Sequence, residues 1–252
     1  MTIAEFFAAN PRCAVAFSGG IDSAWLLHEA LRYGKKVRAY FVRTPFQPAF
    51  ELRDAEDTAA ALGAELTVLE VDVLAISEVA ANPENRCYYC KRALFTALLT
   101  RARADGFPLV LDGSNASDDA GDRPGMRALR ELGVRSPLRE CGVTKAQIRA
   151  QAKAARMALW DKPSYACLAT RIPTGTPIIR EDLRRVEEGE GLLMDLGYSD
   201  FRLRLRGDHA LLQVRSEDID RAAAELPELR QKLRHLFPQV VLDGIPRQIR
   251  ES

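Results

Sequence analysis

The hexapeptide Ser18–Ser23 (Ser-Gly-Gly-Ile-Asp-Ser) combines residue types that suit the binding of a phosphate group. It follows the apolar run Cys13–Phe17 and opens a segment, Ser23–Arg32, with the pattern of a helix. Its glycines permit a close backbone approach, and the N–H groups of a helix N-terminus attract anions. The serine hydroxyls add donors, and Asp22 can cap the helix or help to hold a magnesium ion. We therefore expect an anion site here, in preference to a turn and helix cap without a ligand.

Three of the five cysteines lie in settings that favour chemistry. Cys87 and Cys90 form a C-x-x-C pair, which we place in a loop just before a helix. Such a pair is half of a zinc site, a redox pair or half of an iron–sulfur site. Cys167 lies in a loop between Lys162 and Arg171, whose positive charges would favour a thiolate. Of the remaining two, Cys13 is expected in the core, and Cys141 has no assigned role.

Two further groups of polar residues are candidates. The acidic segment Asp112–Asp119 follows the apolar run Leu109–Leu111, so it would lie at the carboxyl end of a strand, where parallel sheets bind ligands. The alternative is that this segment is a solvent-exposed turn without a function. Arg202, Arg204 and Arg206 alternate with apolar residues and share one face of an expected strand. Such a row is usually solvated, but arginine also suits two-pronged phosphate binding.

The elements that must position these residues form an α/β pattern. Short apolar runs alternate with helical patterns, which predicts a parallel sheet with helices on both faces. We expect strands at 13–17, 37–42, 66–71 and 109–111, and helices at 23–33, 50–62, 91–104 and from Thr144 to 158. A small α+β domain follows, with a helix at 180–196, strands at 201–206 and 210–214, a helix at 216–226 and a strand at 239–242.

The segment Pro163–Pro177, with three prolines, is expected to be a long functional loop at the domain boundary. We place the domains at 1–172 and 173–252.

The composition limits the class of protein. The 252 residues are 47% hydrophobic and 28% charged, which is typical of globular proteins. No apolar run approaches the ~20 residues of a membrane span, and the N-terminus lacks a basic secretory start. We expect a cytoplasmic protein without a disulfide framework or a membrane partner. The net charge of +1 gives no field that favours nucleic acid, so no nucleic-acid partner is expected.

Taken together, the motifs resemble a known family. The hexapeptide resembles the SGGxDS signature of the PP-loop ATP pyrophosphatases, and no G-x-x-x-x-G-K-[ST] or G-x-G-x-x-G motif is present. The loop with the pattern Lys-Pro-x-x-Ala-Cys-Leu-Ala-x-Arg resembles the LarE sulfur transferases, which mature the nickel-pincer cofactor of lactate racemase. The resemblance covers nearly the whole chain. It implies an adenine nucleotide alpha hydrolase-like fold, use of ATP and Mg²⁺, and homo-oligomers.

The resemblance also assigns roles to residues. The ATP site would comprise Ser18, Gly19, Gly20, Ile21, Asp22, Ser23, Arg43, Gly113 and Asn115. Asp22 and Asp118 would hold magnesium, with Asp119 beside them. The substrate phosphate would be received by Arg202 and Arg204, with Arg171 and Glu190 at matching positions. The substrate implied is a pyridinium-3,5-dicarboxylate mononucleotide, whose carboxylate is adenylated and then converted to a thiocarboxylate.

Two sulfur sources occur in such a family. In some members the cysteine that matches Cys167 gives up its own sulfur. In others three cysteines hold a 4Fe-4S cluster, and a sulfide on its open iron is passed on. Cys87 and Cys90 match the second type, so we expect a cluster at Cys87, Cys90 and Cys167. A sacrificial Cys167, a three-cysteine zinc site and a Cys87–Cys90 disulfide remain alternatives for the cysteines. A tRNA-thiolating enzyme, an ammonia-using synthetase and a nucleotide sensor remain alternatives for the function.

Overall fold

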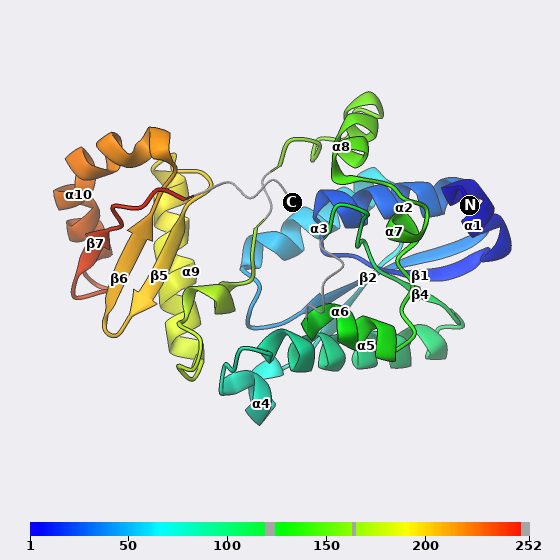
Figure 1. Ribbon diagram of the computed structural model, residues 1–252, viewed down its shortest axis with the longest axis horizontal. Helices are drawn as coiled ribbons and strands as arrows, with labels where there is room; N and C mark the ends of the chain where they lie inside the picture. Colours follow the sequence, from blue (N-terminus) through cyan, green and yellow to red (C-terminus); the bar gives the residue numbers. More distant parts are fainter. Residues whose placement is uncertain (119–123, 163–164, 248–252) are drawn as a thin grey trace. The chain divides into compact units, whose positions relative to one another are not determined.

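The computed structural model describes residues 1–118, 124–162 and 165–247, so Asp119 lies outside the described residues. The chain forms two compact units. The first comprises Met1–Val79 and Asn85–Ser164, and the second comprises Ala80–Glu84 and Tyr165–Glu251. Each unit is described by itself (Figure 1). The expected division into domains 1–172 and 173–252 stays a prediction.

A four-stranded parallel sheet forms the centre of the first unit. Its strands are β1 (Arg12–Ala16), β2 (Lys36–Arg43), β3 (Leu66–Glu70) and β4 (Val110–Leu111), in the order β3-β2-β1-β4. Every pairing in this sheet is parallel. The predicted α/β fold with a parallel sheet is therefore confirmed.

Helices cover both faces of this sheet (Figure 1). They are α1 (Ile3–Ala9), α2 (Ile21–Tyr33), α3 (Ala49–Ala61), α5 (Arg86–Ala104), α6 (Pro124–Glu131), α7 (Pro137–Glu140) and α8 (Lys145–Ala154), and the short helix α4 (Ser77–Ala80) precedes α5. Side chains alternate across β1, so Cys13 and Val15 join a core cluster with α1, α2, α3, α7 and α8, while Ala14 joins one with α5 and α6. Cys13 is fully buried, as predicted.

The strand order places the site. The chain runs from β1 outward through β2 to β3 and then returns to the other side of β1 as β4. Loops leaving β1 and β4 therefore diverge at the carboxyl edge of the sheet, which is where doubly wound sheets bind ligands. The hexapeptide follows β1, and the segment that begins at Asp112 follows β4.

The second unit contains the predicted succession of helix, two strands, helix and strand. These are α9 (Arg180–Asp195), β5 (Arg202–Arg206), β6 (His209–Gln213), α10 (Ile219–Leu233) and β7 (Val240–Leu242). The sheet order is β5-β6-β7, with β5 antiparallel and β7 parallel to β6. At Gly189 on α9 an added Cβ would lie 2.6 Å from Leu203, so the helix packs directly on β5.

Several local expectations were wrong or incomplete, including the helix expected at 216–226, which is α10 at Ile219–Leu233. The C-x-x-C pair does not lie in a loop, because α5 begins at Arg86 and includes both cysteines. The helix after Thr144 ends at Ala154 rather than 158, although Thr144 does cap it. Helix α1 was not predicted; Thr2 and Glu5 form its capping box. Within the described residues, no helix is long and apolar enough to cross a membrane.

Candidate functional site

The hexapeptide forms a tight turn between β1 and α2. Gly19 has a φ of +72°, and an added Cβ would lie 3.2 Å from the backbone of Ala55 on α3. Both the left-handed conformation and the close neighbour require glycine here. Gly20 is the N-cap of α2, and Ile21 is its first residue and is buried. The first turn of α2 therefore directs its N–H groups toward the carboxyl edge of the sheet.

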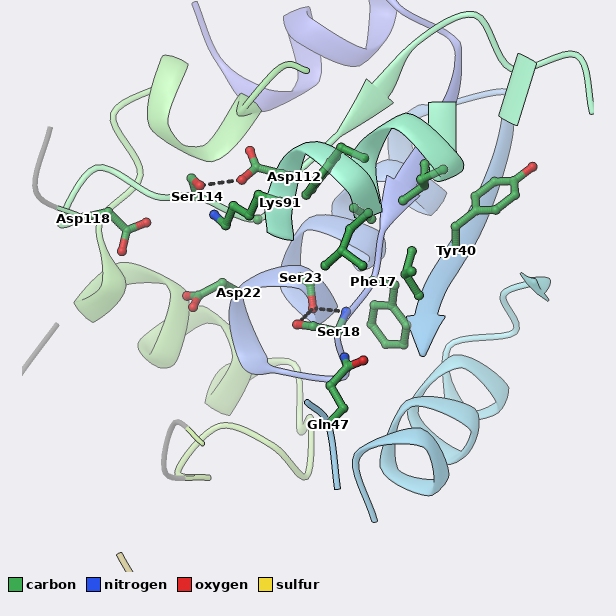
Figure 2. Close-up of a pocket in the computed structure, with 16 residues that line it drawn as sticks. Phe17, Ser18, Asp22, Ser23, Tyr40, Gln47, Lys91, Asp112, Ser114 and Asp118 are labelled. Atoms are coloured by element: carbon green, nitrogen blue, oxygen red, sulfur yellow. Dashed lines mark hydrogen bonds between the residues drawn. The ribbon is translucent and has the colours of Figure 1, made fainter. Parts of the chain in front are cut away.

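Ser18 and Ser23 hold the shape of this turn. The Ser23 hydroxyl donates to the Gly20 carbonyl at 3.0 Å and accepts from the Ser18 N–H at 3.2 Å. The Ser18 and Ser23 hydroxyl oxygens are 3.1 Å apart (Figure 2). The turn is thus held by its own side chains before any ligand is present.

A cavity of about 360 Å³ opens beside this turn (Figure 2). Its volume is within the range of small-molecule sites. Its apolar lining comes mainly from β1, β2 and α5, and its polar lining mainly from the loops after β1 and β4 and from the first turn of α2. The lining residues are Ala16, Phe17, Ser18, Asp22, Ser23, Tyr40, Val42, Gln47, Lys91, Leu94, Phe95, Leu98, Asp112, Gly113, Ser114 and Asp118.

The loop after β4 lies directly against the first turn of α2. An added Cβ at Gly113 would lie 2.9 Å from the Ser23 nitrogen, so only glycine allows this approach. The neighbouring Asp112 is buried and accepts hydrogen bonds from the hydroxyls of Ser114 and Ser136. Segments about 90 residues apart in the chain therefore form one wall of the cavity.

Asp22 and Asp118, the predicted magnesium ligands, both line the cavity. The Asp22 carboxylate pairs with the Lys145 ammonium at 2.5 Å and accepts from the Asn115 amide at 3.4 Å. Asp118 accepts from the Asn115 N–H at 2.8 Å. Two carboxylates beside this turn are a donor set that fits magnesium.

Sequence reasoning missed two lysines of this site. Lys145 is the first residue of α8, and Lys91 follows Cys90 on α5 and lines the cavity. Neither belongs to a recognisable motif; only the fold brings them to the hexapeptide.

The predicted ATP ligand Arg43 is not among the lining residues, and its guanidinium pairs with Glu70 at 3.3 Å. Its role stays a prediction.

The three candidate cysteines lie in two settings. Cys87 and Cys90 are three residues apart near the start of α5, so they share one face of the helix. Cys167 belongs to the second unit and caps a 3₁₀ helix at Leu168–Arg171. None of the five cysteines, all of them in the described part of the chain, forms a disulfide. Among the described residues no group of three Cys, His, Asp or Glu side chains is arranged around a metal position.

Arg171 and Glu190 form a buried ion pair in the second unit. Two Arg171 nitrogens donate to the Glu190 carboxylate at 2.8 and 2.9 Å, and both side chains are essentially inaccessible to solvent. Glu190 also accepts from the Leu203 N–H and from the Tyr165 hydroxyl. Burial, followed by the Glu190 charge, raises the pKa of Tyr165. Glu190 therefore joins the Cys167 segment to β5.

Arg202 and Arg204 lie beside this pair, and no carboxylate among the described residues forms an ion pair with either of them. Arg202 is 6% exposed, donates to the Phe201 carbonyl and has its guanidinium 5.6 Å from the Tyr165 ring centre. Burial, Arg171 and Arg247 lower the pKa of Arg202 to about 10. Within the described residues, Arg204 Nε is buried without a hydrogen-bond partner. Buried positive charge without a counterion is costly, so this cluster suits an anionic ligand.

Comparisons with known proteins agree with this geometry. No protein-family model matches the chain. The chain is 34% identical to an uncharacterized protein of Synechocystis sp. over 246 residues, covering 95% of this chain and 92% of the other. It is 32% identical to the pyridinium-3,5-bisthiocarboxylic acid mononucleotide synthase of Lactiplantibacillus plantarum over 205 residues, 81% of this chain and 74% of that one. The chain belongs to the LarE family.

The LarE family is part of a wider group of PP-loop enzymes. The chain is also 30% identical to the tRNA-specific 2-thiouridylase of Frankia alni over 189 residues, which cover 60% of this chain and 53% of that one. Membership of the LarE family and the PP-loop fold confirm the prediction of an enzyme that uses ATP and transfers sulfur. The cluster, the magnesium ion and the roles of individual residues stay predictions.

Proposed function

We propose that this enzyme adenylates a carboxylate of pyridinium-3,5-dicarboxylate mononucleotide and converts it to a thiocarboxylate, in the biosynthesis of the nickel-pincer cofactor. The observation that carries the proposal is the cavity beside Ser18–Ser23 in a chain 32% identical to a synthase whose product is a pyridinium bisthiocarboxylic acid mononucleotide. A pyrophosphate-releasing ATP site supplies the activation, because AMP leaves a carbonyl far more readily than oxide does.

The cavity has two kinds of wall that suit the two ends of ATP. The apolar side chains of Phe17, Val42 and Phe95 suit the adenine. The first turn of α2, the Ser18 hydroxyl and Lys91 suit the phosphates. Magnesium at Asp22 and Asp118 would neutralise phosphate charge when bound. The chain's own contribution is to hold the α-phosphate and the attacking carboxylate in one geometry.

The arginine cluster supports a substrate that carries a phosphate. Arg202 and Arg204 present guanidinium groups whose charges are unmatched within the described residues. A phosphate monoester supplies two negative charges and accepts several charge-assisted hydrogen bonds. We assign the phosphate of the mononucleotide to these two residues, with the Arg171–Glu190 pair holding the surrounding loop in place.

The preferred sulfur source is a 4Fe-4S cluster held by Cys87, Cys90 and Cys167. These thiols fit such a cluster in part. Cys87 and Cys90 lie within one turn of α5 in the first unit, whereas Cys167 belongs to the second unit. When bound, the cluster would supply an iron that lacks a protein ligand and can carry sulfide. The alternative is that Cys167 gives up its own sulfur.

Pyrophosphate release tests the activity. The purified enzyme should release pyrophosphate when ATP and the dicarboxylate mononucleotide are both present, and the product should gain the mass difference of sulfur for oxygen. A tRNA transcript serves as the control substrate. Pyrophosphate release with tRNA alone, or none with the mononucleotide, would show that the proposed substrate is wrong.

Replacement of Cys87 separates the two sulfur sources. With a cluster, protein reconstituted anaerobically should bind about four irons, and Cys87→Ala should lose both iron and sulfur transfer while still releasing pyrophosphate. With a sacrificial cysteine, Cys87→Ala should stay active, and the wild-type mass should fall by the mass of H₂S after turnover, because Cys167 would become dehydroalanine. Cys141→Ala is the matched control, since Cys141 packs at the edge of the core rather than at the site.

A further inference from the structure

The arginine cluster of the second unit includes one residue that no motif indicates. Arg247 follows β7, and its backbone N–H donates to the Val214 carbonyl at 2.8 Å. Four residues earlier, the backbone N–H of Asp243 donates to the Leu212 carbonyl of β6 at 2.7 Å. The chain after β7 therefore runs along the end of β6.

This anchoring brings Arg247 to the arginines of β5. Gln213 on β6 is the direct cross-strand partner of Arg202, and neighbours in such a register have Cβ atoms roughly 5 Å apart. The Gln213 amide in turn donates to the Ile245 carbonyl at 3.3 Å. Arg247 thus lies one strand away from Arg202, and its charge lowers the pKa of both Arg202 and Arg204, after the larger effect of burial.

Only part of the Arg247 guanidinium is used. Its Nη2 pairs with Asp200 at 2.7 Å, with both side chains largely buried. Its Nε is buried and has no hydrogen-bond partner within the described residues, as is also true of Arg204 Nε. Asp200 itself has a φ of +49°, a conformation that aspartate tolerates better than most residues. The Asp200 carboxylate therefore holds one edge of Arg247 and leaves another N–H available.

We propose that Arg247 is a third phosphate-binding arginine of this site and that Asp200 positions it. The phosphate monoester of the substrate would accept hydrogen bonds from Arg202, Arg204 and Arg247, and two of these three donors would use an Nε–H that has no partner in the described structure. The inference rests on the proposed function, because it assumes that the substrate carries a phosphate. It extends that function by adding a residue that selects the phosphorylated substrate.

Equilibrium binding without ATP tests this assignment separately from turnover. The probes are nicotinate mononucleotide, which is a pyridinium carboxylate with a phosphate, and its riboside, which lacks the phosphate. Wild-type protein should prefer the mononucleotide. Arg247→Ala should weaken mononucleotide binding by about tenfold or more, the size expected for a charge-assisted hydrogen bond, and leave riboside binding unchanged. Arg234→Ala, an exposed arginine of the same unit, is the charge-matched control.

A second variant separates binding from folding. Asp200→Asn removes the same ion pair but keeps the arginine, so it should lower the thermal midpoint as much as Arg247→Ala while losing only part of the preference for the phosphate. The assignment is overturned if Arg247→Ala keeps the wild-type preference, or if Asp200→Asn loses as much of it as Arg247→Ala. If the wild type and Arg202→Ala both show no preference, the phosphate site of the proposed function fails instead.

Discussion

Lys145 gives the proposed ATP site a positive charge that belongs to no phosphate-binding motif. It begins α8, immediately after the capping residue Thr144, and its ammonium meets Asp22 at the first turn of α2. The side chain is mostly buried, so the pair is only weakly screened by solvent. In the proposed ATP site, Lys145 can keep Asp22 oriented or move to a phosphate oxygen when ATP enters; in both cases its charge acts on the reacting groups.

Replacement of Lys145 should therefore impair activation. Lys145→Ala should lower the rate of ATP-dependent pyrophosphate release by about tenfold to a hundredfold, the loss of one or two charge-assisted contacts. Lys145→Arg should recover part of the rate. Lys153→Ala removes an exposed lysine of the same helix and should leave the rate unchanged. Equal rates for the Lys145 and Lys153 variants would show that Lys145 has no part in activation.

Gly113 tests how closely the two loops must approach. A methyl group there would lie 2.9 Å from the Ser23 nitrogen, and a backbone atom cannot yield as a flexible side chain can. Gly113→Ala should cost about 1–3 kcal/mol of unfolding free energy and weaken ATP binding measured by calorimetry. Gly191→Ala is the control, because Gly191 lies on α9 with nothing near its missing Cβ, and alanine there should stabilise by up to ~1 kcal/mol.

At the scale of elements, Glu190 joins three segments of the second unit. It lies on α9, accepts two hydrogen bonds from Arg171 of the 3₁₀ helix, and accepts a third from the Leu203 N–H of β5. The loop that carries Cys167 is thereby fixed to the strand that carries Arg202 and Arg204. A mutation at Glu190 would thus alter both segments of the proposed site at once.

Loss of the Glu190 charge should be costly. Glu190→Gln keeps the shape but leaves the buried Arg171 without a counterion, so we expect a loss of about 3–5 kcal/mol in urea unfolding. Glu188→Gln on the same helix removes an exposed carboxylate paired with Arg184 and should cost less than ~1 kcal/mol. A small loss at Glu190 would mean that solvent reaches Arg171 in solution.

At the scale of the whole molecule, the buried Cys13 thiol makes stability depend on alkaline pH. Burial raises the pKa of Cys13 to about 12, whereas an unfolded cysteine has a pKa of about 8.5. The unfolded chain therefore releases the thiol proton at a lower pH than the folded chain does. The full stabilisation is present below pH ~8.5, and the free energy of unfolding falls by ~1.4 kcal/mol per pH unit as the pH rises from there toward 12. Between pH 7.5 and 10, the free energy of urea unfolding should decrease less for Cys13→Ala than for the wild type. Parallel decreases would contradict this assignment.

Local signals in the sequence predicted the elements better than the meeting points between them. The hexapeptide, the succession of strands and helices along the chain and the Thr144 cap were readable because each depends on neighbouring residues. The pair Cys87 and Cys90 was wrongly placed in a loop, because cysteine and tyrosine form helices weakly and mark no helix start. Lys145, Lys91 and Arg247 carry no local signal, since their roles depend on segments far away in the chain. The close approach at Gly113 likewise follows only from the fold.

The short segment Ala80–Glu84 has a consequence for how the chain is made. It belongs to the second unit, where the buried Asn82 amide donates to the carbonyls of Pro173 and Thr176 at 2.8 and 3.1 Å. During synthesis on the ribosome these partners emerge about 90 residues later. The stretch just before Cys87 must therefore wait, unmatched, until most of the protein has been translated. This stretch would acquire its final contacts only after the sheet of the first unit has been made, and a fragment that starts at residue 165 would lack part of its own fold.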